Sequence, residues 1–318
     1  MSRKSFLATA VAAVTGCALA VPFTADAQTT ASATAAPYVD MSNSQVDMLH
    51  QAITGAGLKS FSAAFVTGSG CDQIWGDTLP IGKDPKVDGE IEKARSEGAS
   101  PIISTGGAAG LPLAWTCTDQ QAIQKGYQQI IDTYKVNQLD FDIEGAAQND
   151  TAAAARNMKA VKALKASNPD LEISVTLPVL PDGLTQDGLK PVQAAKDAGV
   201  RIDIVNIMAM DYNQGSQDMG KAATSAAQAT LKQIQGIDSG YSNANIGITP
   251  MIGTNDDNST LTMDNAKAVA EWAKSNQVGR LSFWSLNRDK ACDSAARASS
   301  TCSGVAQSPL DFTKAFTG

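Results

Sequence analysis

The chain has 318 residues, a formal net charge of −7 and a single histidine, His50. The acidic balance and the lack of a Lys/Arg cluster argue against a nucleic acid or an anionic membrane as a partner. With only one histidine, a metal site built from histidines is implausible. The single histidine also removes the Ser-His-Asp and Cys-His triads from consideration. We expect neither a metal nor a cofactor. The length is compatible with one large domain or two small ones.

The first residues are typical of an export signal. Two basic residues precede an apolar stretch, and Ala25-Asp26-Ala27 supplies the small residues of a cleavage site. We therefore expect a signal peptide at 1–27, a flexible tail at 28–36 and a secreted, bacterial protein. The stretch is too diluted by polar residues to favour a membrane span. Val14-Thr15-Gly16-Cys17 resembles a lipoprotein box, which makes lipid anchoring at Cys17 the less favoured alternative.

Beyond residue 36, short apolar runs alternate with amphipathic or alanine-rich stretches at a spacing of about 35 residues. The predicted strands are Tyr38–Met41, Phe61–Gly68, Pro101–Thr105, Gln138–Glu144, Glu172–Pro178, Ile202–Met210, Asn245–Ile252 and Arg280–Leu286. The predicted helices lie at 44–55, 88–98, 119–135, 150–167, 186–198, 219–235, 262–276 and 309–316.

This alternation predicts an α/β fold, a single-domain (β/α)8 TIM barrel at 37–318. Several strands, such as the one at 202–210, are apolar on both faces, as buried parallel strands are. A doubly wound open sheet is the alternative, but no Gly-x-Gly-x-x-Gly turn follows a predicted strand. Residues 253–279 are mostly one helix, so we expect no α+β subdomain inserted between the seventh and eighth strands.

The cysteines fit an exported protein. Four remain after the predicted cleavage, and an even number in such a chain indicates two disulfides. Cys292 and Cys302 would close a short local loop, and Cys71 with Cys117 would then tie two loops that lie further apart. Their spacings match no zinc signature.

Three carboxylates alternate with apolar residues in the fourth predicted strand, where the chain reads Asp140-Phe141-Asp142-Ile143-Glu144. Alternate side chains of a strand share a face, so the acids project to one side about 6.5–7 Å apart. Crowding of like charges raises the pKa of at least one acid, which is useful in acid catalysis. The alternative is a solvated face of an antiparallel strand.

Other strand ends carry polar or aromatic residues that would meet the acids in one cleft, because reactive residues of a barrel stand at the carboxyl ends of its strands. They are Ser104-Thr105-Gly106-Gly107, Met210-Asp211-Tyr212 and Trp284. Glu144 is outermost and is the candidate acid. Apart from Asp211, these strand ends offer no carboxylate that would oppose it, so the site suits a substrate that brings its own nucleophile.

These motifs resemble those of the chitinases of glycoside hydrolase family 18, in particular the small bacterial type without accessory domains. The family signature DxxDxDxE reads Asn137-Gln138-Leu139-Asp140-Phe141-Asp142-Ile143-Glu144, and SxGG reads Ser104-Thr105-Gly106-Gly107. The sixth-strand motif Met-x-Tyr-Asp-aromatic appears as Met208-Ala209-Met210-Asp211-Tyr212, and the tryptophan that closes the eighth strand is Trp284. The resemblance covers the chain from about Tyr38.

The resemblance implies an endo-chitinase that hydrolyses β-1,4 linkages between N-acetylglucosamine units by a retaining, substrate-assisted mechanism with an oxazolinium intermediate. Glu144 would be the general acid and base. Asp142 would orient the acetamido group, and Asp140 would take up the proton arrangement left behind. Trp284 would stack under the distorted sugar, and Asp211 would hydrogen-bond near the reacting centre.

Two positions depart from the family pattern. Asn137 replaces the first Asp of the signature, and Met210 stands where a tyrosine usually donates a hydrogen bond to the acetamido oxygen. Tyr212 or Tyr38 is the candidate replacement, so Met210, Tyr212 and Tyr38 join the expected substrate-binding residues. We expect a monomer that binds chitin or its oligosaccharides. The alternatives are an endo-β-N-acetylglucosaminidase acting on the N-glycan core and a non-catalytic chitin-binding protein on the same scaffold.

Overall fold

Parallel strands form the centre of the structure, which is a computed structural model that describes residues 1, 33–76, 79–215, 217–293 and 297–318. The described strands, in chain order, are β1 (Thr34–Ala35), β2 (Tyr38–Asp40), β3 (Ser60–Ser69), β4 (Asp72–Trp75), β5 (Leu79–Pro80), β6 (Ser100–Gly106), β7 (Gln138–Asp142), β8 (Glu172–Pro178), β9 (Ile204–Met208), β10 (Ile246–Thr249), β11 (Gly253–Thr254), β12 (Thr260–Leu261) and β13 (Arg280–Leu281). The predicted signal peptide at 1–27 and Cys17 lie outside the described residues.

Eleven of these strands belong to one sheet, in the order β1-β13-β10-β9-β8-β7-β6-β3-β4-β5, with β2 paired to β3. All pairs except β3 with β4 and β4 with β5 are parallel. Each of the eight predicted strands has a counterpart. The later ones are shorter than predicted because the chain turns away sooner; the Met210 amide, for example, already bonds to the Met208 carbonyl.

The segment that holds β1 and β2 bonds to β13 and to β3, which are separated by five other strands in the sheet. Its Ala36 and Tyr38 amides donate to carbonyls of the eighth predicted strand, and the Pro37 carbonyl accepts from Ser62 of β3. The prediction of a flexible tail at 28–36 is therefore wrong for its last residues, because Thr34–Ala35 is a strand and Ala36 is fully buried. A mostly parallel sheet joined in this way is TIM-barrel-like.

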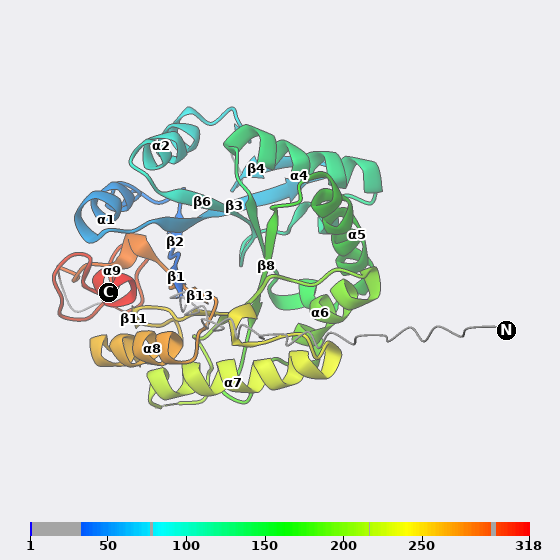
Figure 1. Ribbon diagram of the computed structural model, residues 1–318. Coiled ribbons are helices and arrows are strands. Elements are labelled where there is room, and N and C mark those ends of the chain that lie inside the picture. The colour runs from blue at the N-terminus through cyan, green and yellow to red at the C-terminus, as the bar shows by residue number, and fades with distance from the viewer. Residues whose placement is uncertain (2–32, 77–78, 216, 294–296) are drawn as a thin grey trace. The chain divides into compact units, whose positions relative to one another are not determined.

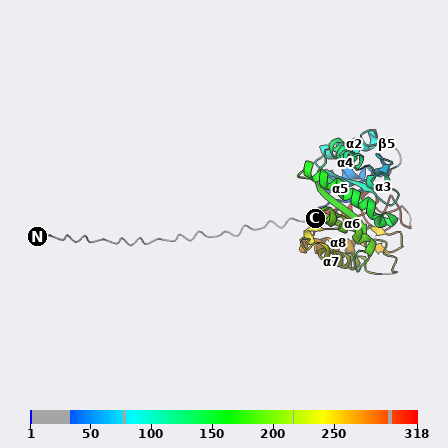
Figure 2. The same ribbon diagram turned by 90° about the vertical axis from the view of Figure 1, so that its right-hand side faces the viewer.

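Helices follow the strands and lie around the outside of the sheet (Figure 1). They are α1 (Met48–Ala56), α2 (Pro85–Ser96), α3 (Leu113–Thr116), α4 (Gln120–Tyr134), η1 (Gly145–Asn149), α5 (Thr151–Ser167), α6 (Gln186–Ala198), α7 (Met219–Ile237), η2 (Asn243–Asn245), α8 (Met263–Ser275), η3 (Leu286–Arg288) and α9 (Asp311–Thr317). Figure 2 shows α4, α5, α6 and α7 one below another along one side.

Local sequence signals set where these helices begin. Asp119 and Asp150 cap α4 and α5, because each side chain accepts a hydrogen bond from backbone amides of the first turn. The buried face of α4 then packs on the outer face of β7, where the Tyr127 and Phe141 rings lie edge to face with centroids 5.1 Å apart. Packing on Phe141 leaves the acids of β7 on the opposite, inner face.

Two short pairs of strands extend beyond the predicted alternation. β3 continues into the antiparallel strands β4 and β5, and a disulfide between Cys71 and Cys117 joins this lobe to the end of α3. The second disulfide joins Cys292 and Cys302. Between β10 and β13, the chain forms the β11–β12 hairpin and α8.

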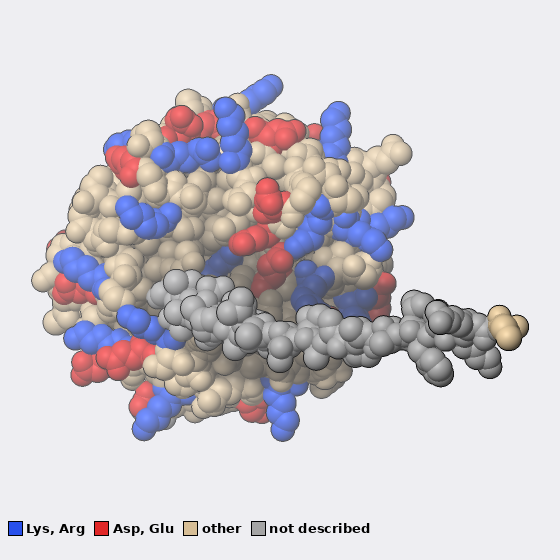
Figure 3. Space-filling model, in the orientation of Figure 1, with Lys and Arg blue, Asp and Glu red and all other residues tan. Residues whose placement is uncertain are grey.

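Charges of both signs are interspersed on the face seen in Figure 3. Among the described residues, no helix combines the length and apolarity needed to cross a bilayer.

A buried carboxylate holds the last helix. Asp289 is fully buried, and its two oxygens accept hydrogen bonds from the Phe312 and Thr313 amides, the Thr313 hydroxyl and the Gln307 side chain. These donors come from the first turn of α9 and from the segment before it. The contact is therefore an anion at a helix N-terminus, where the helix dipole favours negative charge.

We expect Asp289→Ala to destabilise the protein by about 2–4 kcal/mol, because four donors would lose their acceptor inside the protein. Thermal unfolding monitored by circular dichroism should show Tm falling by roughly 5–10 °C. Asp311→Asn is the matched control, since Asp311 lies on the same helix but is partly exposed. Equal Tm values for the two variants would contradict this assignment.

Candidate active site

The three carboxylates of the predicted signature lie where β7 ends. Asp140 and Asp142 belong to the strand, and Glu144 follows it as the residue before η1. Asp140 is fully buried, Asp142 is 4% exposed and Glu144 is half-buried. Burial therefore decreases from Asp140 to Glu144, and the outermost acid is the one that can meet a ligand. This is no solvated strand face.

Asp140 is surrounded by hydroxyl groups. Its Oδ1 accepts from the Ser174 and Thr176 hydroxyls at 2.6 and 2.8 Å. Its Oδ2 accepts from the Tyr38 and Ser104 hydroxyls at 2.8 and 2.7 Å. Four donors on one carboxylate satisfy a buried negative charge that would otherwise be costly. Asp140 is therefore a fixed anchor of the site.

Neutral side chains extend this network along the interior. The Asn206 amide donates to Thr176 at 3.0 Å, and its oxygen accepts from the Thr249 hydroxyl at 2.8 Å. All three residues are almost fully buried. The interior between β7 and β10 is thus a hydrogen-bonded layer and not an apolar core, which holds the Asp140 partners in place.

The Asp142 and Glu144 carboxyl groups lie within hydrogen-bonding reach of each other, and two carboxyl groups can bond to each other only when one of them keeps a proton. Burial raises the pKa of Asp142 well above its ordinary value, and the charges of Glu144 and Asp140 raise it further. Burial also raises the pKa of Glu144; the hydrogen bond from Asp142 opposes this, and the charge of Asp211 adds to it. The pair therefore keeps a proton to higher pH than ordinary carboxylic acids do.

Two glycines at the end of β6 allow a close approach to these acids. Gly106 has φ +104°, and a Cβ there would lie 2.1 Å from the Asp142 carbonyl oxygen. Gly107 has φ +85°, and a Cβ there would lie 2.7 Å from the Phe65 ring. A residue with a side chain fits neither position, which explains the glycine pair of the motif.

Asp211 lies near Glu144 on the loop after β9. It has φ +48°, and its Oδ1 accepts a hydrogen bond from the Asp257 amide at 3.1 Å. Burial raises the pKa of Asp211; the amides of Asp257 and Asp256 lower it, and the charges of these two acids raise it. The loop after β11 thus holds Asp211 in place.

Tyr212 follows directly and is 3% exposed. Its hydroxyl oxygen is buried without a hydrogen-bond partner in the protein. Buried hydroxyls are normally paired, so this donor needs a partner that the described part of the chain does not supply. Tyr38, the other candidate donor, is 2% exposed, and its hydroxyl contacts Asp140 and Thr176. Met210 is half-buried.

Aromatic rings form one wall of the site. Trp284 is half-buried and stacks on Phe65, with centroids 5.7 Å apart and an interplanar angle of 15°. The Tyr38 ring lies 6.1 Å from each of them. A cavity of about 580 Å³ opens beside these rings, and its lining includes Phe65, Trp284 and Gly106, which pairs with Asp142 in the sheet. An aromatic wall beside an acid pair suits a sugar ring.

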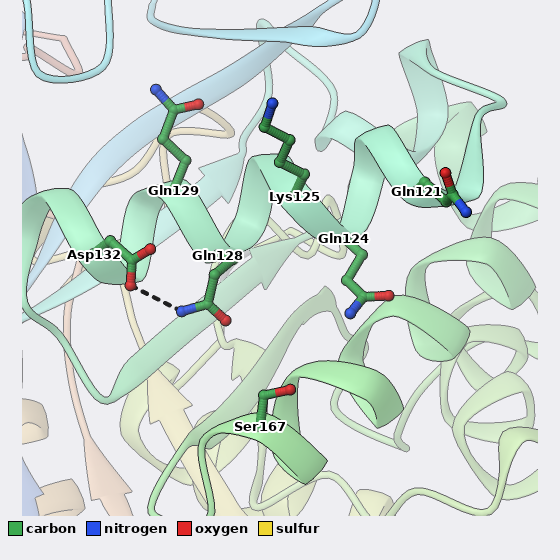
Figure 4. A pocket seen from close by; sticks show the side chains of 7 residues that line it. All are labelled: Gln121, Gln124, Lys125, Gln128, Gln129, Asp132 and Ser167. Carbon is green, nitrogen blue, oxygen red and sulfur yellow. Dashed lines mark hydrogen bonds between the residues drawn. The ribbon is translucent and has the colours of Figure 1, made fainter.

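A second cavity has no relation to this chemistry. It lies along the polar face of α4 opposite Ser167, the last residue of α5 (Figure 4). Four glutamines, a lysine and an aspartate line it, and it contains none of the predicted site residues. Among the described residues, no group of three or more His, Cys, Asp or Glu side chains is arranged to hold a metal ion.

Comparisons with known proteins agree on one family. No model of a known protein family matches the sequence. The chain is 32% identical over 275 residues to a probable bifunctional chitinase/lysozyme of Escherichia coli (strain K12), which covers 80% of this chain and 30% of that protein. It is 32% identical over 272 residues to endochitinase 11 of Metarhizium anisopliae, which covers 80% and 52%. The chain thus spans about half or less of these curated relatives.

Solved structures match most of the chain. Active domain 2 of the chitinase from Pyrococcus furiosus superposes with a TM-score of 0.80 at 30% identity, over 89% of this chain and 93% of that one. This chain belongs to the chitinases of glycoside hydrolase family 18. A glycoside hydrolase family 18 chitinase from Pseudoalteromonas aurantia, 14% identical, shares the fold with a TM-score of 0.60 over 80% and 94% of the chains.

Several interior residues of the site were not predicted from the sequence. Ser174, Thr176 and Asn206 hold Asp140 or its partners, and Phe65 stacks on Trp284. The two hydroxyls at i and i+2 of an otherwise apolar strand were a signal for an inward polar face. Phe65 carried no such signal, because its contact depends on two strands that lie far apart in the sequence.

We expect Asp142→Asn to be more thermostable than the natural protein at neutral and alkaline pH. Because the folded-state pKa of Asp142 is raised, stability is lost as pH rises from the unfolded-state pKa of this group to its folded-state pKa, and the loss is complete above the latter. Asn keeps a donor for Glu144 without the charge. Tm should rise by about 2–5 °C at pH 8 and by less at pH 4. Asp170→Asn, an exposed acid, is the control; a pH-independent difference for Asp142→Asn would count against the interpretation.

Proposed function

We propose that this chain is a secreted endo-chitinase that hydrolyses β-1,4 linkages between N-acetylglucosamine units. The observation that carries the proposal is the close pair of carboxyl groups, Asp142 and Glu144, beside an aromatic wall. It is supported by the chitinase relatives and by a structure of the Pyrococcus furiosus domain described as complexed with chito-oligosaccharides. A product profile on N-acetylglucosamine oligomers, run beside an N-glycoprotein, separates this activity from an endo-β-N-acetylglucosaminidase.

Glu144 is the general acid in this proposal. It is the outermost carboxyl group, it is half-buried, and its raised pKa favours the protonated form that a leaving oxygen needs. The proton shared with Asp142 passes to Glu144, which donates it to the glycosidic oxygen as the bond to the anomeric carbon breaks and leaves Asp142 ionised. In the second step the Glu144 carboxylate takes a proton from water, and the hydroxide formed attacks the anomeric carbon.

The nucleophile of the first step is the acetamido oxygen of the substrate. A retaining enzyme with its own nucleophile needs a second carboxylate about 5–5.5 Å from the acid, across the scissile bond. Here Asp142 donates its hydrogen bond to Glu144, and Asp211 is held by the Asp257 amide. Attack of the acetamido oxygen on the anomeric carbon gives an oxazolinium ion. The Asp142 carboxylate turns from Glu144 and accepts a hydrogen bond from the N–H group of this ion. Retention of configuration follows.

Other residues bind the reacting sugar. Tyr212 donates its unpaired hydroxyl to the acetamido oxygen, and so replaces the tyrosine that Met210 displaces. Trp284 stacks under the sugar, Met210 borders it, and Asp211 bonds near the anomeric centre. The rings of Tyr38 and Phe65 support Trp284 from behind.

The architecture follows the same proposal. We infer a closed (β/α)8 barrel, supported by the bonds of segment 34–40 to both β13 and β3. The segment between β10 and β13 holds only a short hairpin and α8. We infer that no α+β subdomain deepens the cleft, which suits endo-cleavage by a secreted monomer. The two disulfides are compatible with an oxidising compartment.

Glu144→Gln should lower kcat for chitin oligomers about 10²–10⁴-fold, because general acid–base catalysis is lost. Binding of the oligomers, measured by calorimetry, should change little, since the amide has the same shape. Glu172→Gln is the control, because Glu172 is an exposed acid on the neighbouring strand β8. Near-normal hydrolysis by Glu144→Gln would refute the assignment.

Thiazoline analogues of the cyclised intermediate should inhibit the enzyme competitively if the acetamido group takes part. Tyr212→Phe should weaken this inhibition by roughly 10–100-fold, since one hydrogen bond to a charged ligand is lost. Tyr241→Phe is the matched control, because the Tyr241 hydroxyl bonds to the Ile202 amide. Insensitivity of the natural enzyme to thiazolines would exclude acetamido participation, and equal inhibition of Tyr212→Phe would exclude Tyr212 as the donor.

A further inference from the structure

A buried arginine lies at the start of the eighth strand of the barrel. Arg280 is 5% exposed and pairs in register with Gly247 of β10 and Thr34 of β1. Its side chain lies within 4.0 Å of no carboxylate oxygen in the part of the chain that the structure describes. Burying a cation without an ion pair is costly, so its polar contacts need an explanation.

Arg280 reaches across the interior to the strands that carry the acids. One guanidinium nitrogen donates to the Ser174 hydroxyl of β8 at 2.7 Å, and the other terminal nitrogen donates to Gln138 of β7 at 3.1 Å. In the sheet, β10 and β9 lie between β13 and β8, so these bonds cross the interior and do not follow the sheet. Both acceptors are neutral.

Ser174 connects this cation to Asp140. Its hydroxyl accepts from Arg280 and donates its single hydrogen to Asp140 Oδ1 at 2.6 Å. Because a hydroxyl has one hydrogen, the bond from Arg280 fixes its direction and polarises it toward the carboxylate. The positive charge therefore acts on Asp140 through one intervening oxygen.

The charged and titratable groups around Asp140 come from three elements. Asp142 lies two residues along β7, Tyr38 projects from β2, and Arg280 reaches in from β13. The partners from β6 and β8 are the neutral hydroxyls of Ser104, Ser174 and Thr176. Glu172, which shares the face of Ser174 at the start of β8, is exposed. Among these groups, Arg280 is the cation, so it opposes the negative field that Asp140 exerts on Asp142.

We propose that Arg280 is a positioning residue for the proposed chitinase reaction: through Ser174 it fixes the Asp140 carboxylate and offsets part of the negative charge that this carboxylate places beside Asp142 and Glu144. The proposal rests on the proposed function, because it concerns the acid that function requires. Without the cation, Asp142 and Glu144 would hold their proton to higher pH, because less positive charge would oppose the field of Asp140. A proton held more tightly by Asp142 would reach the glycosidic oxygen through Glu144 less readily.

The test compares pH profiles of kcat/KM on chitin oligomers for the natural enzyme, Arg280→Met and Ser174→Ala. Both variants should move the alkaline limb up by about 0.5–1 pH unit and lower turnover at neutral pH about 3–10-fold. Arg280→Lys keeps the charge, so its alkaline limb should lie close to that of the natural enzyme. Combining Arg280→Met with Ser174→Ala should add little to either change, because both interrupt one connection.

Thr105→Val is the matched control. Thr105 is equally buried, but its hydroxyl donates to the Asp140 backbone oxygen and not to the carboxylate, so its profile should not move. A purely structural Arg280 would lower Tm and leave the alkaline limb unchanged, and that result would overturn the proposal. If Arg280→Met does not fold, Ser174→Ala alone decides. Failure of the natural enzyme to cleave chitin oligomers would instead refute the proposed function.

Discussion

Crowding of three carboxylates on one face of β7 is the constraint on which the rest of the structure depends. Asp140 and Asp142 are almost completely buried, and like charges this close cannot all remain ionised at low cost. The protein resolves the conflict by treating the acids differently. Asp140 receives four hydroxyl donors, whereas Asp142 and Glu144 share a proton. The proposed chemistry uses this division between one carboxyl group held by fixed donors and a neighbouring pair whose pKa values are raised.

The barrel-like architecture makes this arrangement possible. The donors to Asp140 come from β2, β6 and β8, which are far apart in the chain but face one interior. Helices such as α4 cover the outer, apolar face of β7 and leave its inner face to polar side chains. The N-terminal segment contributes directly, since Tyr38 both donates to Asp140 and packs against Trp284. The segment that bonds to both β13 and β3 therefore also helps to assemble the site.

The loops at the carboxyl ends of the strands then adjust the reacting acids. Burial raises the pKa of Glu144, and Asp211 adds a charge from a loop that the Asp257 amide fixes. The glycine pair after β6 lets the Asp142 backbone and the Phe65 ring come close, where any side chain would collide. Together these loops hold the acid pair at the carboxyl end of β7 and let an aromatic wall form at the ends of neighbouring strands.

The sequence by itself determined the alternation of strands and helices, the row Asp140–Glu144 and the motif positions, because hydrophobic periodicity, caps and side-chain alternation are local properties. Tertiary structure alone decided that Tyr38 bonds to Asp140, that Phe65 stacks on Trp284 and that Arg280 reaches Ser174. Those contacts join residues from distant strands, and their geometry is set by the register and curvature of the sheet. No local pattern encodes them, since each partner also suits an ordinary place in a barrel wall.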